Sequence, residues 1–310
     1  MDVIRGIEKI PAGLRNAVVT IGNFDGVHLG HQRLLKRLRE DAHEENLKTV
    51  VITFDPHPKM ILRPEVRPFY LIATLEEKIA LLKDTGIDAA IIISFTCEYA
   101  QKTAEEFIRQ VLWDGLRIRK IVIGHDYTFG KGKEGNESFL ESFGKKLGFG
   151  VDVINAVGVG DTVISSTAIR NAILSGDVKK AASLLGRPYN ISGPVVHGKH
   201  RGAGIGFPTA NIKPEKVLIP AGGIYAVIAC LKGKRYPGVA NIGVNPTFDN
   251  GALSVEAHIL DFGDNIYGET LDILFIDRIR DEIKFPGPSE LASQIKQDIE
   301  RARKILKLHF

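Results

Sequence analysis

Two histidines, His28 and His31, lie three residues apart at a point where a strand-like pattern is replaced by a helical one. A β-branched run before them ends at Gly22, and the pattern after them becomes helical. Strand, glycine turn and helix start predict a turn at the carboxyl edge of a parallel sheet, where ligands bind and helix N–H groups favour anions. Two imidazoles on one face of a first helical turn could stabilise a phosphate under attack. The stretch therefore predicts a phosphate site.

A lone histidine near a strand end is more often a hydrogen-bonded structural group than a catalytic one. Here the pair is accompanied by Gly26 and Gly30, which let a ligand approach the backbone closely. Neither the dinucleotide-binding nor the P-loop glycine pattern fits the stretch. What remains, His-x-Gly-His, resembles the signature of the nucleotidyltransferase superfamily.

Hydroxyl side chains and an arginine open a later helix. Ser165, Ser166 and Thr167 come directly before or at its start, and Arg170 is expected on its first turn. N-capping would explain the hydroxyls. It does not explain the arginine, because a cation near a helix N-terminus opposes the macrodipole unless an anion is bound. The group suits a triphosphate, and the segment alone leaves capping and binding equally open.

The C-terminal half carries a second set of candidates. A glycine-rich loop from Gly198 to Gly206 could wrap phosphates, although a hairpin loop is as common an explanation. Thr209 and Asn211 alternate on an extended segment and so point the same way, as hard oxygen ligands that could hold magnesium on a nucleotide. Glu256 lies on a strand whose apolar residues face the other side. It is either a surface glutamate or a general base for a substrate hydroxyl.

The elements that must position these residues alternate in the first half of the chain. Strands are expected at 18–21, 49–54, 89–95, 120–123 and 151–154, and helices around 34–39, 74–82, 103–112 and 138–147. Thr74 and Glu77 have capping-box spacing, and the continuous apolar run at 89–95 is typical of a strand buried in a parallel sheet. The alternation predicts a doubly wound, Rossmann-like α/β domain.

From about Gly186 the composition shifts to short β segments with glycine-rich loops. Strands are expected at 187–196, 224–231, 236–242, 254–260 and 270–279, with one closing helix at 289–308. This spacing predicts an antiparallel β-barrel. A helix over about 171–186 is expected to bridge two domains, 1–185 and 186–310.

Composition excludes several classes of protein. A chain of 310 residues is long enough for two domains, and its net charge of +4 is spread, apart from a basic cluster on the first helix that is interpreted as a solvated face. Nucleic-acid binding therefore has little support. No apolar run has the length of a membrane helix and no signal-peptide core is present, so a cytoplasmic protein is expected. Cys97 and Cys230 lie far apart without metal-ligand spacing, which argues against a disulfide framework or a zinc site.

Taken in order, the motifs resemble one family over nearly the whole chain, the bifunctional prokaryotic FAD synthetases (riboflavin kinase/FMN adenylyltransferases). In the first half the resemblance rests on Gly22–His31, Phe54–Pro58, Gly124–Gly130 and Ser165–Arg170. In the second half it rests on Gly206–Ile212, Asn241–Phe248, Val255–Phe262 and Arg278–Glu282. Each piece is weak alone, and all of them in this order are specific.

The resemblance implies two reactions and the residues for each. A C-terminal riboflavin kinase barrel would transfer the γ-phosphate of ATP to riboflavin, giving FMN, and an N-terminal nucleotidyltransferase domain would transfer AMP to FMN, giving FAD and pyrophosphate. It implies catalytic roles for His28, His31 and Glu256, and Mg²⁺ as cofactor. The implied adenylyltransferase residues are Gly22, Phe24, Asp25, Gly26, His28, His31, Ser166, Thr167 and Arg170 for ATP, and Pro56, Pro58, Asp126, Tyr127 and Phe129 for the flavin. The implied kinase residues are Gly198, Gly206, Pro208, Thr209 and Asn211 for ATP, Thr209 and Asn211 for the metal, and Arg278 and Glu282 for the flavin.

The implied partners are the small molecules riboflavin, FMN and ATP, bound by a monomer or weak homo-oligomer, with no nucleic acid and no membrane. Three positions depart from the family pattern. Tyr127 replaces a common phenylalanine and keeps a ring for flavin packing. Lys133 replaces an arginine and cannot reproduce a bidentate phosphate contact. Ala203 replaces a basic residue of the kinase loop.

Two rival interpretations remain, an enzyme with one degenerate domain and a regulator that only senses flavin. The intact histidine pair and the set Thr209, Asn211 and Glu256 argue against both. A sensor has no need for a general base beside a magnesium site.

Overall fold

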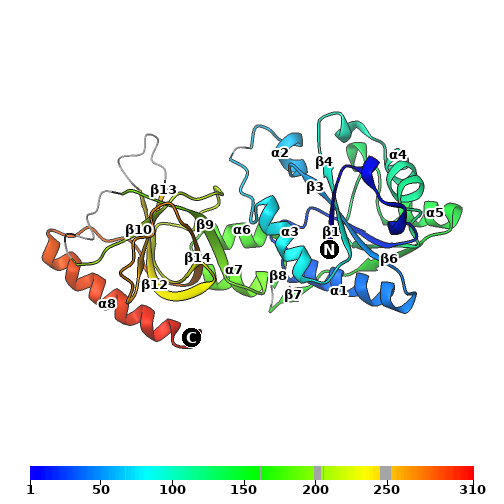
Figure 1. Cartoon of the computed structure of the whole chain (residues 1–310). Coiled ribbons are helices and arrows are strands. Elements are labelled where there is room, and N and C mark those ends of the chain that lie inside the picture. The colour runs from blue at the N-terminus through cyan, green and yellow to red at the C-terminus, as the bar shows by residue number, and fades with distance from the viewer. Residues whose placement is uncertain (67, 161, 199–203, 205, 245–252) are drawn as a thin grey trace. The chain divides into compact units, whose positions relative to one another are not determined.

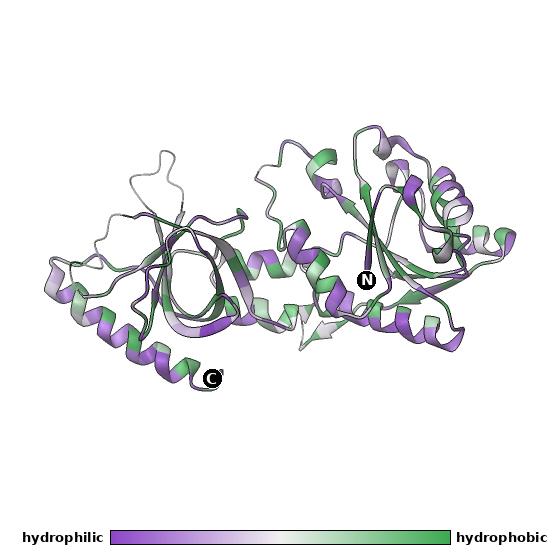
Figure 2. Cartoon of the chain, viewed as in Figure 1, coloured by the Kyte–Doolittle hydropathy of each residue, from purple (hydrophilic) through white to green (hydrophobic). Residues whose placement is uncertain are grey.

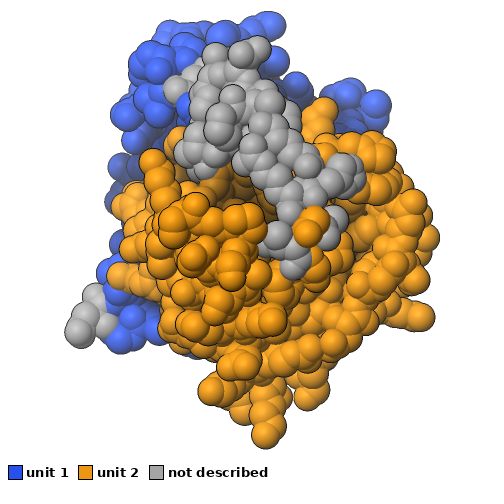
Figure 3. All heavy atoms as spheres, turned by 90° about the vertical axis from the view of Figure 1, so that its left-hand side faces the viewer, with its two compact units in different colours: residues 1–69, 73–165 blue, residues 70–72, 166–310 orange. Residues whose placement is uncertain are grey.

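The computed structural model describes residues 1–66, 68–160, 162–198, 204, 206–244 and 253–310 (Figure 1). The predictions that involve Ala203 and residues 245–248 lie outside this set. The chain forms two compact units, coloured separately in Figure 3. Unit 1 comprises residues 1–69 and 73–165, and unit 2 comprises residues 70–72 and 166–310.

Unit 1 is built on a six-stranded parallel sheet in the order β1-β4-β3-β2-β5-β6. The strands are β1 (Asp2–Arg5), β2 (Val18–Ile21), β3 (Thr49–Asp55), β4 (Ala89–Ser94), β5 (Lys120–Gly124) and β6 (Gly150–Ile154). In register, Val18 of β2 faces Thr49 of β3 on one side and Lys120 of β5 on the other. The chain passes from β2 outward through β3 and β4 and then crosses to β5. The sheet therefore has its topological switch point beside β2, where α/β folds bind ligands.

Helices cover both faces of this sheet. On one face α1 (Leu29–Glu44) and α3 (Leu75–Asp84) pack against residues such as Val51 of β3. On the other face α4 (Ala104–Phe107), a π-helical stretch (Ile108–Gly115) and α5 (Glu137–Leu147) pack against residues such as Ile52. Adjacent residues of one strand are thus buried on opposite faces, and Figure 2 shows these strands as largely hydrophobic. The predicted doubly wound domain is confirmed.

Most expected elements of unit 1 occur within one or two residues of their predicted bounds. The capping box of α3 forms, since Thr74 Oγ1 accepts the Glu77 N–H and the Glu77 carboxylate accepts the Thr74 N–H. Strand β1 was not predicted, because four residues are too few to show a period. The helix expected at 103–112 continues to Gly115 with π-type hydrogen bonds. Short elements complete the unit: α2 (Pro58–Leu62), β7 (Gly158–Val159) and β8 (Thr162–Val163).

Unit 2 begins with two helices, α6 (Ser166–Leu174) and α7 (Val178–Leu185). The single bridging helix predicted over 171–186 is therefore wrong. The chain turns at Gly176, whose φ is 80°, and Asp177 caps the start of α7 by accepting the Lys180 N–H. Aspartate is a favoured N-cap residue, so Asp177 marks the start of a second helix, and the sequence prediction overlooked it.

A closed antiparallel barrel follows in unit 2, in the order β10-β13-β12-β11-β14-β9. Its strands are β9 (Tyr189–Val196), β10 (Ala210–Ile212), β11 (Gly223–Leu231), β12 (Lys234–Val244), β13 (Leu253–Ile259) and β14 (Thr270–Arg280). Tyr225 of β11 and Phe275 of β14 are fully buried, and their ring centroids lie 5.3 Å apart. The predicted barrel is confirmed.

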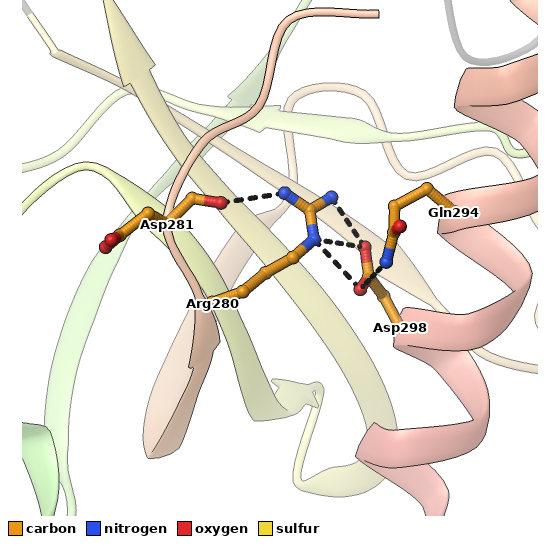
Figure 4. A network of polar contacts seen from close by, with 4 residues as sticks. All are labelled: Arg280, Asp281, Gln294 and Asp298. Carbon is orange, nitrogen blue, oxygen red and sulfur yellow. Dashed lines mark hydrogen bonds and ion pairs between the residues drawn. The ribbon is translucent and has the colours of Figure 1, made fainter.

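The closing helix α8 (Pro288–Leu306) packs on the outer face of β11 and β14 through Ala302 and Leu306. A buried ion pair holds it, since Arg280 of β14 donates to both carboxylate oxygens of Asp298 at 2.7–3.1 Å (Figure 4). Gln294 donates to the same carboxylate at 3.0 Å. Among the described residues, no helix is both long and apolar enough to cross a membrane.

Candidate functional sites

The turn after β2 adopts a costly backbone conformation. Gly22 prolongs the ladder of β2 by donating to the Ile52 carbonyl, after which Phe24, Gly26 and Val27 have φ of 48°, 80° and 39°. Positive φ at a non-glycine residue costs on the order of 1–3 kcal/mol and persists where packing over-determines it. Phe24 and Val27 are 1% and 2% exposed, so the core holds them in place.

Asp25 in this turn is buried and accepts the backbone N–H of Ala73 at 3.1 Å. These buried contacts fix the backbone conformation of the turn that leads into α1. This is the preorganisation that a site for charge stabilisation needs.

His28 is the N-cap of α1. Its Nδ1 accepts the His31 backbone N–H at 3.3 Å. A neutral imidazole that accepts at Nδ1 carries its proton on Nε2. His28 thus has the structural, hydrogen-bonded role that is common for a lone histidine. The same hydrogen bond leaves Nε2–H as a donor at the start of α1.

The His31 ring stacks on that of His28, with centroids 3.6 Å apart and planes 15° apart. Its Nδ1 is buried and has no hydrogen-bond partner among the described residues. Burial lowers the pKa of His31 well below its usual value, and the charges of His28 and Lys78 lower it further. His31 therefore offers an uncharged imidazole with an unpartnered ring nitrogen at the start of α1.

Lys78 was missed by the sequence interpretation. It lies on α3 and is 6% exposed, and its Nζ donates to Thr53 Oγ1 at 3.3 Å and to the Phe54 carbonyl at 3.2 Å. Burial lowers its pKa, although the carboxylates of Asp25 and Asp55 oppose that shift. The signal available was a lysine on the apolar face of a predicted helix.

The residues predicted to bind flavin follow β3 and β5, the two neighbours of β2. Pro56 follows a cis peptide bond, and Pro58 opens α2. The rings of Tyr127 and Phe129 stack with centroids 5.5 Å apart, while Asp126 is exposed. Together with the histidine turn, these residues occupy one carboxyl edge of the sheet.

Three more aromatic residues lie at this edge and were not predicted as site residues. Phe54 is the penultimate residue of β3, and its ring centroid is 5.5 Å from that of Phe95 and 6.3 Å from that of Tyr99, both of which follow β4. Burial raises the pKa of Tyr99 and of Tyr127, and Tyr99 acts on Tyr127. The Tyr99 hydroxyl is buried without a hydrogen-bond partner among the described residues. The three rings are inclined to one another by 57–83° and form an apolar cluster with one buried polar atom, which is suited to packing against the edge of an aromatic heterocycle.

Ser166, Thr167 and Arg170 lie on α6, which begins at Ser166. Arg170 is therefore in the second helical turn and not the first, which is a correction. Its Nε donates to the Tyr70 carbonyl at 2.6 Å, so part of its hydrogen bonding is structural. These three residues belong to unit 2 and the histidines to unit 1. Their sharing of one ATP site remains a prediction.

The barrel brings together the acidic and polar candidates of the second set. In register, Glu256 of β13 faces Asn211 of β10. Thr209 Oγ1 donates to a Glu256 carboxylate oxygen in a long hydrogen bond of 3.4 Å. Neighbouring Val255 and Ala257 are buried on the opposite face of β13, and Glu256 is half-buried. Glu256 is thus clustered with both predicted metal ligands.

A close backbone approach completes this cluster. A Cβ at Gly198 would lie 2.2 Å from Asn211 Nδ2, so the position must be glycine for that side chain to keep its place. Gly206 and Pro208 lie between Gly198 and Thr209 in the connection that precedes β10. The Nδ1 of His258 donates to the Pro208 carbonyl at 2.8 Å.

Asn241 on β12 faces Glu256 from the side opposite Asn211. Its Oδ1 is buried without a hydrogen-bond partner among the described residues. The sequence interpretation used Asn241 only as part of a motif. Its strand register with Glu256 could not be read from the sequence, because the turn that sets the register was unknown.

The predicted flavin residues of the barrel lie at the end of β14. Arg278 donates to the Gly222 carbonyl and pairs with Asp281 at 2.7 Å. A Cβ at Gly243 would lie 2.3 Å from Glu282 Oε1, so the Glu282 side chain folds onto bare backbone. Arg278 is half-buried and held by these contacts, whereas Glu282 is exposed although its carboxylate approaches Gly243.

Each unit therefore has one chemically competent cluster. Unit 1 offers hydrogen-bond donors at a strand-to-helix turn and a buried lysine on α3, which suits attack at a phosphate. Unit 2 offers a carboxylate, a hydroxyl and amides on a rigid barrel. No group of three or more His, Cys, Asp or Glu side chains that could hold a metal occurs among the described residues. The oxygen donors Thr209, Asn211 and Glu256 fit magnesium that is held mainly by nucleotide phosphates.

Comparison with known proteins gives consistent matches to both units. A family model for FAD synthetase matches residues 10–168, and one for riboflavin kinase matches residues 185–306. A bifunctional riboflavin kinase/FMN adenylyltransferase from Haemophilus influenzae is 40% identical over 98% of this chain and 98% of its own. The protein of that name from Escherichia coli K12 is 38% identical over 99% of each chain.

A solved structure has the same fold over its whole length. It is described as a macrolide-efflux protein from Streptococcus pneumoniae, has a TM-score of 0.91 and is 36% identical, and the match covers 98% of this chain and 99% of that chain. Its description differs from those of the sequence relatives, and the efflux role is a statement about that protein only.

Proposed function

Because this chain belongs to the bifunctional riboflavin kinase/FMN adenylyltransferase family, we propose that its two reactions use separate sets of residues, one around His28 and one around Glu256. The enzyme phosphorylates riboflavin to FMN with ATP and then adenylylates FMN to FAD with release of pyrophosphate. The FAD synthetase match covers the N-terminal part and the riboflavin kinase match the C-terminal part.

For adenylyl transfer, a phosphate oxygen of FMN attacks the α-phosphorus of ATP while the bond to the bridging oxygen of pyrophosphate breaks. The Nε2–H of His28 and the ring of His31 donate to the oxygens of the α-phosphate, where charge develops. The turn formed by Gly22, Phe24, Asp25 and Gly26 lines this position. Ser166, Thr167 and Arg170 hold the remaining phosphates of ATP.

The flavin of FMN packs at the same edge of the sheet. Pro56, Pro58, Tyr127 and Phe129 supply an apolar surface for the ring system, and Asp126 supplies a polar contact. The stacked pair of Tyr127 and Phe129 supports this assignment.

For the kinase reaction, the ribityl 5′-hydroxyl attacks the γ-phosphorus and ADP leaves. Glu256 accepts the hydroxyl proton and aligns the oxygen, which is the carboxylate role typical of phosphoryl transfer. Thr209 and Asn211 hold Mg²⁺ with the ATP phosphates, and the loop from Gly198 through Gly206 and Pro208 covers the nucleotide. Bound magnesium neutralises the charge on the phosphates. Arg278 and Glu282 hold the flavin.

One observation carries the assignment of the kinase residues: Glu256 is in register with Asn211 and hydrogen-bonded to Thr209. We further propose a boundary between the catalytic domains at 185/186, supported by the start of the riboflavin kinase match at residue 185. We also propose that the enzyme acts in the cytoplasm, as a monomer or weak homo-oligomer that binds no nucleic acid.

Two single substitutions test the division of labour. His28→Ala is expected to abolish FAD formation while leaving FMN formation from riboflavin intact. Glu256→Gln is expected to abolish FMN formation while leaving FAD formation from supplied FMN intact. Products are separated by chromatography after incubation with ATP and magnesium.

Exposed residues of the same types provide matched controls. His43→Ala, at the other end of α1, and Glu300→Gln, on α8, should leave both activities unchanged. Loss of both activities in either test variant, with the fold intact, would overturn the assignment of two separate sites. Flavin binding without any product would favour a sensor.

A further inference from the structure

A tyrosine hydroxyl is buried among aromatic rings at the carboxyl edge of the parallel sheet. Tyr99 begins a short 3₁₀ turn after β4, and its ring centroid lies 5.8 Å from that of Phe95 and 6.3 Å from that of Phe54. The side chain is half-buried, and its hydroxyl oxygen is buried without a hydrogen-bond partner in the part of the chain that the structure describes. Buried polar groups are nearly always paired in folded proteins, so this hydroxyl needs an explanation.

Two contacts fix the segment that carries Tyr99. The ammonium of Lys102 lies 5.8 Å from the centre of the Tyr99 ring, which is a cation–π contact. The carbonyl of Lys102 accepts the backbone N–H of Lys131 at 2.8 Å. Lys131 follows closely on Tyr127 and Phe129, the stacked pair proposed to pack against the flavin. The segment after β4 is therefore attached to the segment that carries these two residues.

The hydroxyl of Tyr99 is available as a donor. Phe54 and Phe95, the rings beside it, have no polar atom that could accept its proton. Burial raises the pKa of Tyr99, so the hydroxyl keeps its proton at neutral pH. A tyrosine O–H can donate one hydrogen bond. An occupant that suits this cluster is an aromatic heterocycle with a hydrogen-bond acceptor at its edge.

We propose that Tyr99 is a further binding residue for FMN in adenylyl transfer, whose hydroxyl donates a hydrogen bond to a carbonyl oxygen or ring nitrogen at the edge of the flavin. The neighbouring rings are half-buried, so the edge of the heterocycle can pack against them and reach the hydroxyl. Bound FMN then supplies the acceptor that the free enzyme lacks. This inference rests on the proposed packing of the flavin against Tyr127 and Phe129.

Tyr99→Phe is the direct test, because it removes the hydroxyl and keeps the ring. At saturating ATP the KM for FMN in FAD formation should rise about threefold to tenfold, the effect of losing one hydrogen bond. The kcat should stay within about twofold of the wild-type value, because the bond to the flavin is made equally in the bound substrate and in the transition state. The KM for ATP and the rate of FMN formation from riboflavin should not change.

The stability of the free enzyme distinguishes a ligand-binding hydroxyl from a structural one. Removal of an unpaired buried hydroxyl relieves a cost, so the urea midpoint of Tyr99→Phe, followed by Trp113 fluorescence, should equal or exceed that of the wild type. A hydroxyl that is bonded to an ordered water would lower the midpoint when it is removed. A lower midpoint would therefore contradict the proposal, because it would reveal a partner in the free enzyme.

Two further variants separate this inference from the function on which it rests. Tyr236→Phe removes a tyrosine hydroxyl from β12 of the barrel and should leave the KM for FMN in FAD formation at its wild-type value. Tyr127→Leu removes a ring of the proposed flavin surface and should raise that KM. If Tyr127→Leu leaves the KM for FMN unchanged, the proposed place of the flavin fails. If Tyr127→Leu raises it and Tyr99→Phe does not, the inference about Tyr99 fails.

Discussion

At the scale of single residues, His28 combines two roles that the sequence presents as alternatives. It caps α1 through Nδ1, and this cap fixes its other nitrogen as a donor. The spacing of His28 and His31 was sufficient to predict the pair. The stacking of their rings and the burial of Lys78 could not be predicted, because both depend on how α1 and α3 pack on the sheet.

The low pKa of His31 predicts a pH dependence of stability. A histidine in an unfolded chain has a pKa near 6.5. Below that pH the unfolded chain therefore binds a proton at residue 31, whereas folded His31 stays unprotonated because its pKa is lower. The contribution of His31 is therefore fully favourable above about pH 6.5, and stability is lost as the pH falls below it. The loss approaches about 1.4 kcal/mol per pH unit for one proton.

The chain has a single tryptophan, Trp113, which lies in unit 1, so tryptophan fluorescence reports the unfolding of unit 1. Urea unfolding followed by its fluorescence at pH 7.5 and 5.5 should show a larger loss in the wild type than in His31→Asn. A variant at the exposed His43 should behave as the wild type. Equal losses in all three proteins would contradict the assigned pKa shift.

At the scale of elements, two interactions stabilise the helices of the two units: the capping box at the start of α3 and the ion pair that attaches α8 to the barrel. The capping box of α3 was predicted from two residues, Thr74 and Glu77, because capping is a local interaction. The Arg280–Asp298 pair was not predicted, because it joins a strand and a helix that are far apart in the sequence. The two attachments lead to different predictions.

Thr74→Ala should weaken the start of the helix that carries Lys78. Loss of such a cap costs about 1 kcal/mol. Thr103→Ala removes an equivalent capping box from α4, which carries no proposed site residue. We expect similar losses of stability by Trp113 fluorescence in urea but a lower rate of FAD formation only in Thr74→Ala. Equal effects on FAD formation would show that α3 has no special part in the site.

Asp298→Asn should destabilise unit 2 strongly. Arg280 and Asp298 are 13% and 2% exposed at their side chains, and removing one partner of a buried pair costs about 3–5 kcal/mol because the other charge is left unpaired. Loss of FMN-forming activity on heating should occur at lower temperature. The Trp113 transition should not move, because that residue belongs to unit 1. Exposed Glu300→Gln on the same helix is the control.

At the scale of the whole molecule, two folds of different class carry the two reactions. The change from alternating helices and strands to short strands near Gly186 predicted both classes. It could not predict the strand orders, since these depend on pairings between distant segments. The predicted flavin and ATP residues of unit 1 are likewise neighbours only because β3 and β5 flank β2.

If the two sites work separately, two inactive enzymes should complement each other. Each variant by itself, His28→Ala or Glu256→Gln, should fail to form FAD when riboflavin is the only flavin supplied with ATP and magnesium. A mixture of both should form it after a lag, because FMN made by the first variant reaches the second through solution. Chromatography of timed samples measures the lag. Absence of FAD from the mixture, with each remaining single activity intact, would contradict separate sites linked by free FMN.

Metal removal provides a further check on the kinase assignment. EDTA should stop FMN formation, and added magnesium should restore it, because Thr209 and Asn211 are proposed to hold the metal with ATP. Thr209→Ala should raise the magnesium concentration needed for half-maximal FMN formation. An unchanged requirement would remove Thr209 from the proposed metal site.

Residues 70–72 are counted with unit 2, although the chain on either side of them belongs to unit 1. Within unit 2, Arg170 donates to the Tyr70 carbonyl and the buried Lys216 donates to the Ile72 carbonyl at 3.1 Å. A gene divided at residue 165 would therefore give a second product that lacks the carbonyls of Tyr70 and Ile72, to which Arg170 and Lys216 donate. The second half of the chain thus depends for two hydrogen-bond acceptors on a segment encoded in the first half.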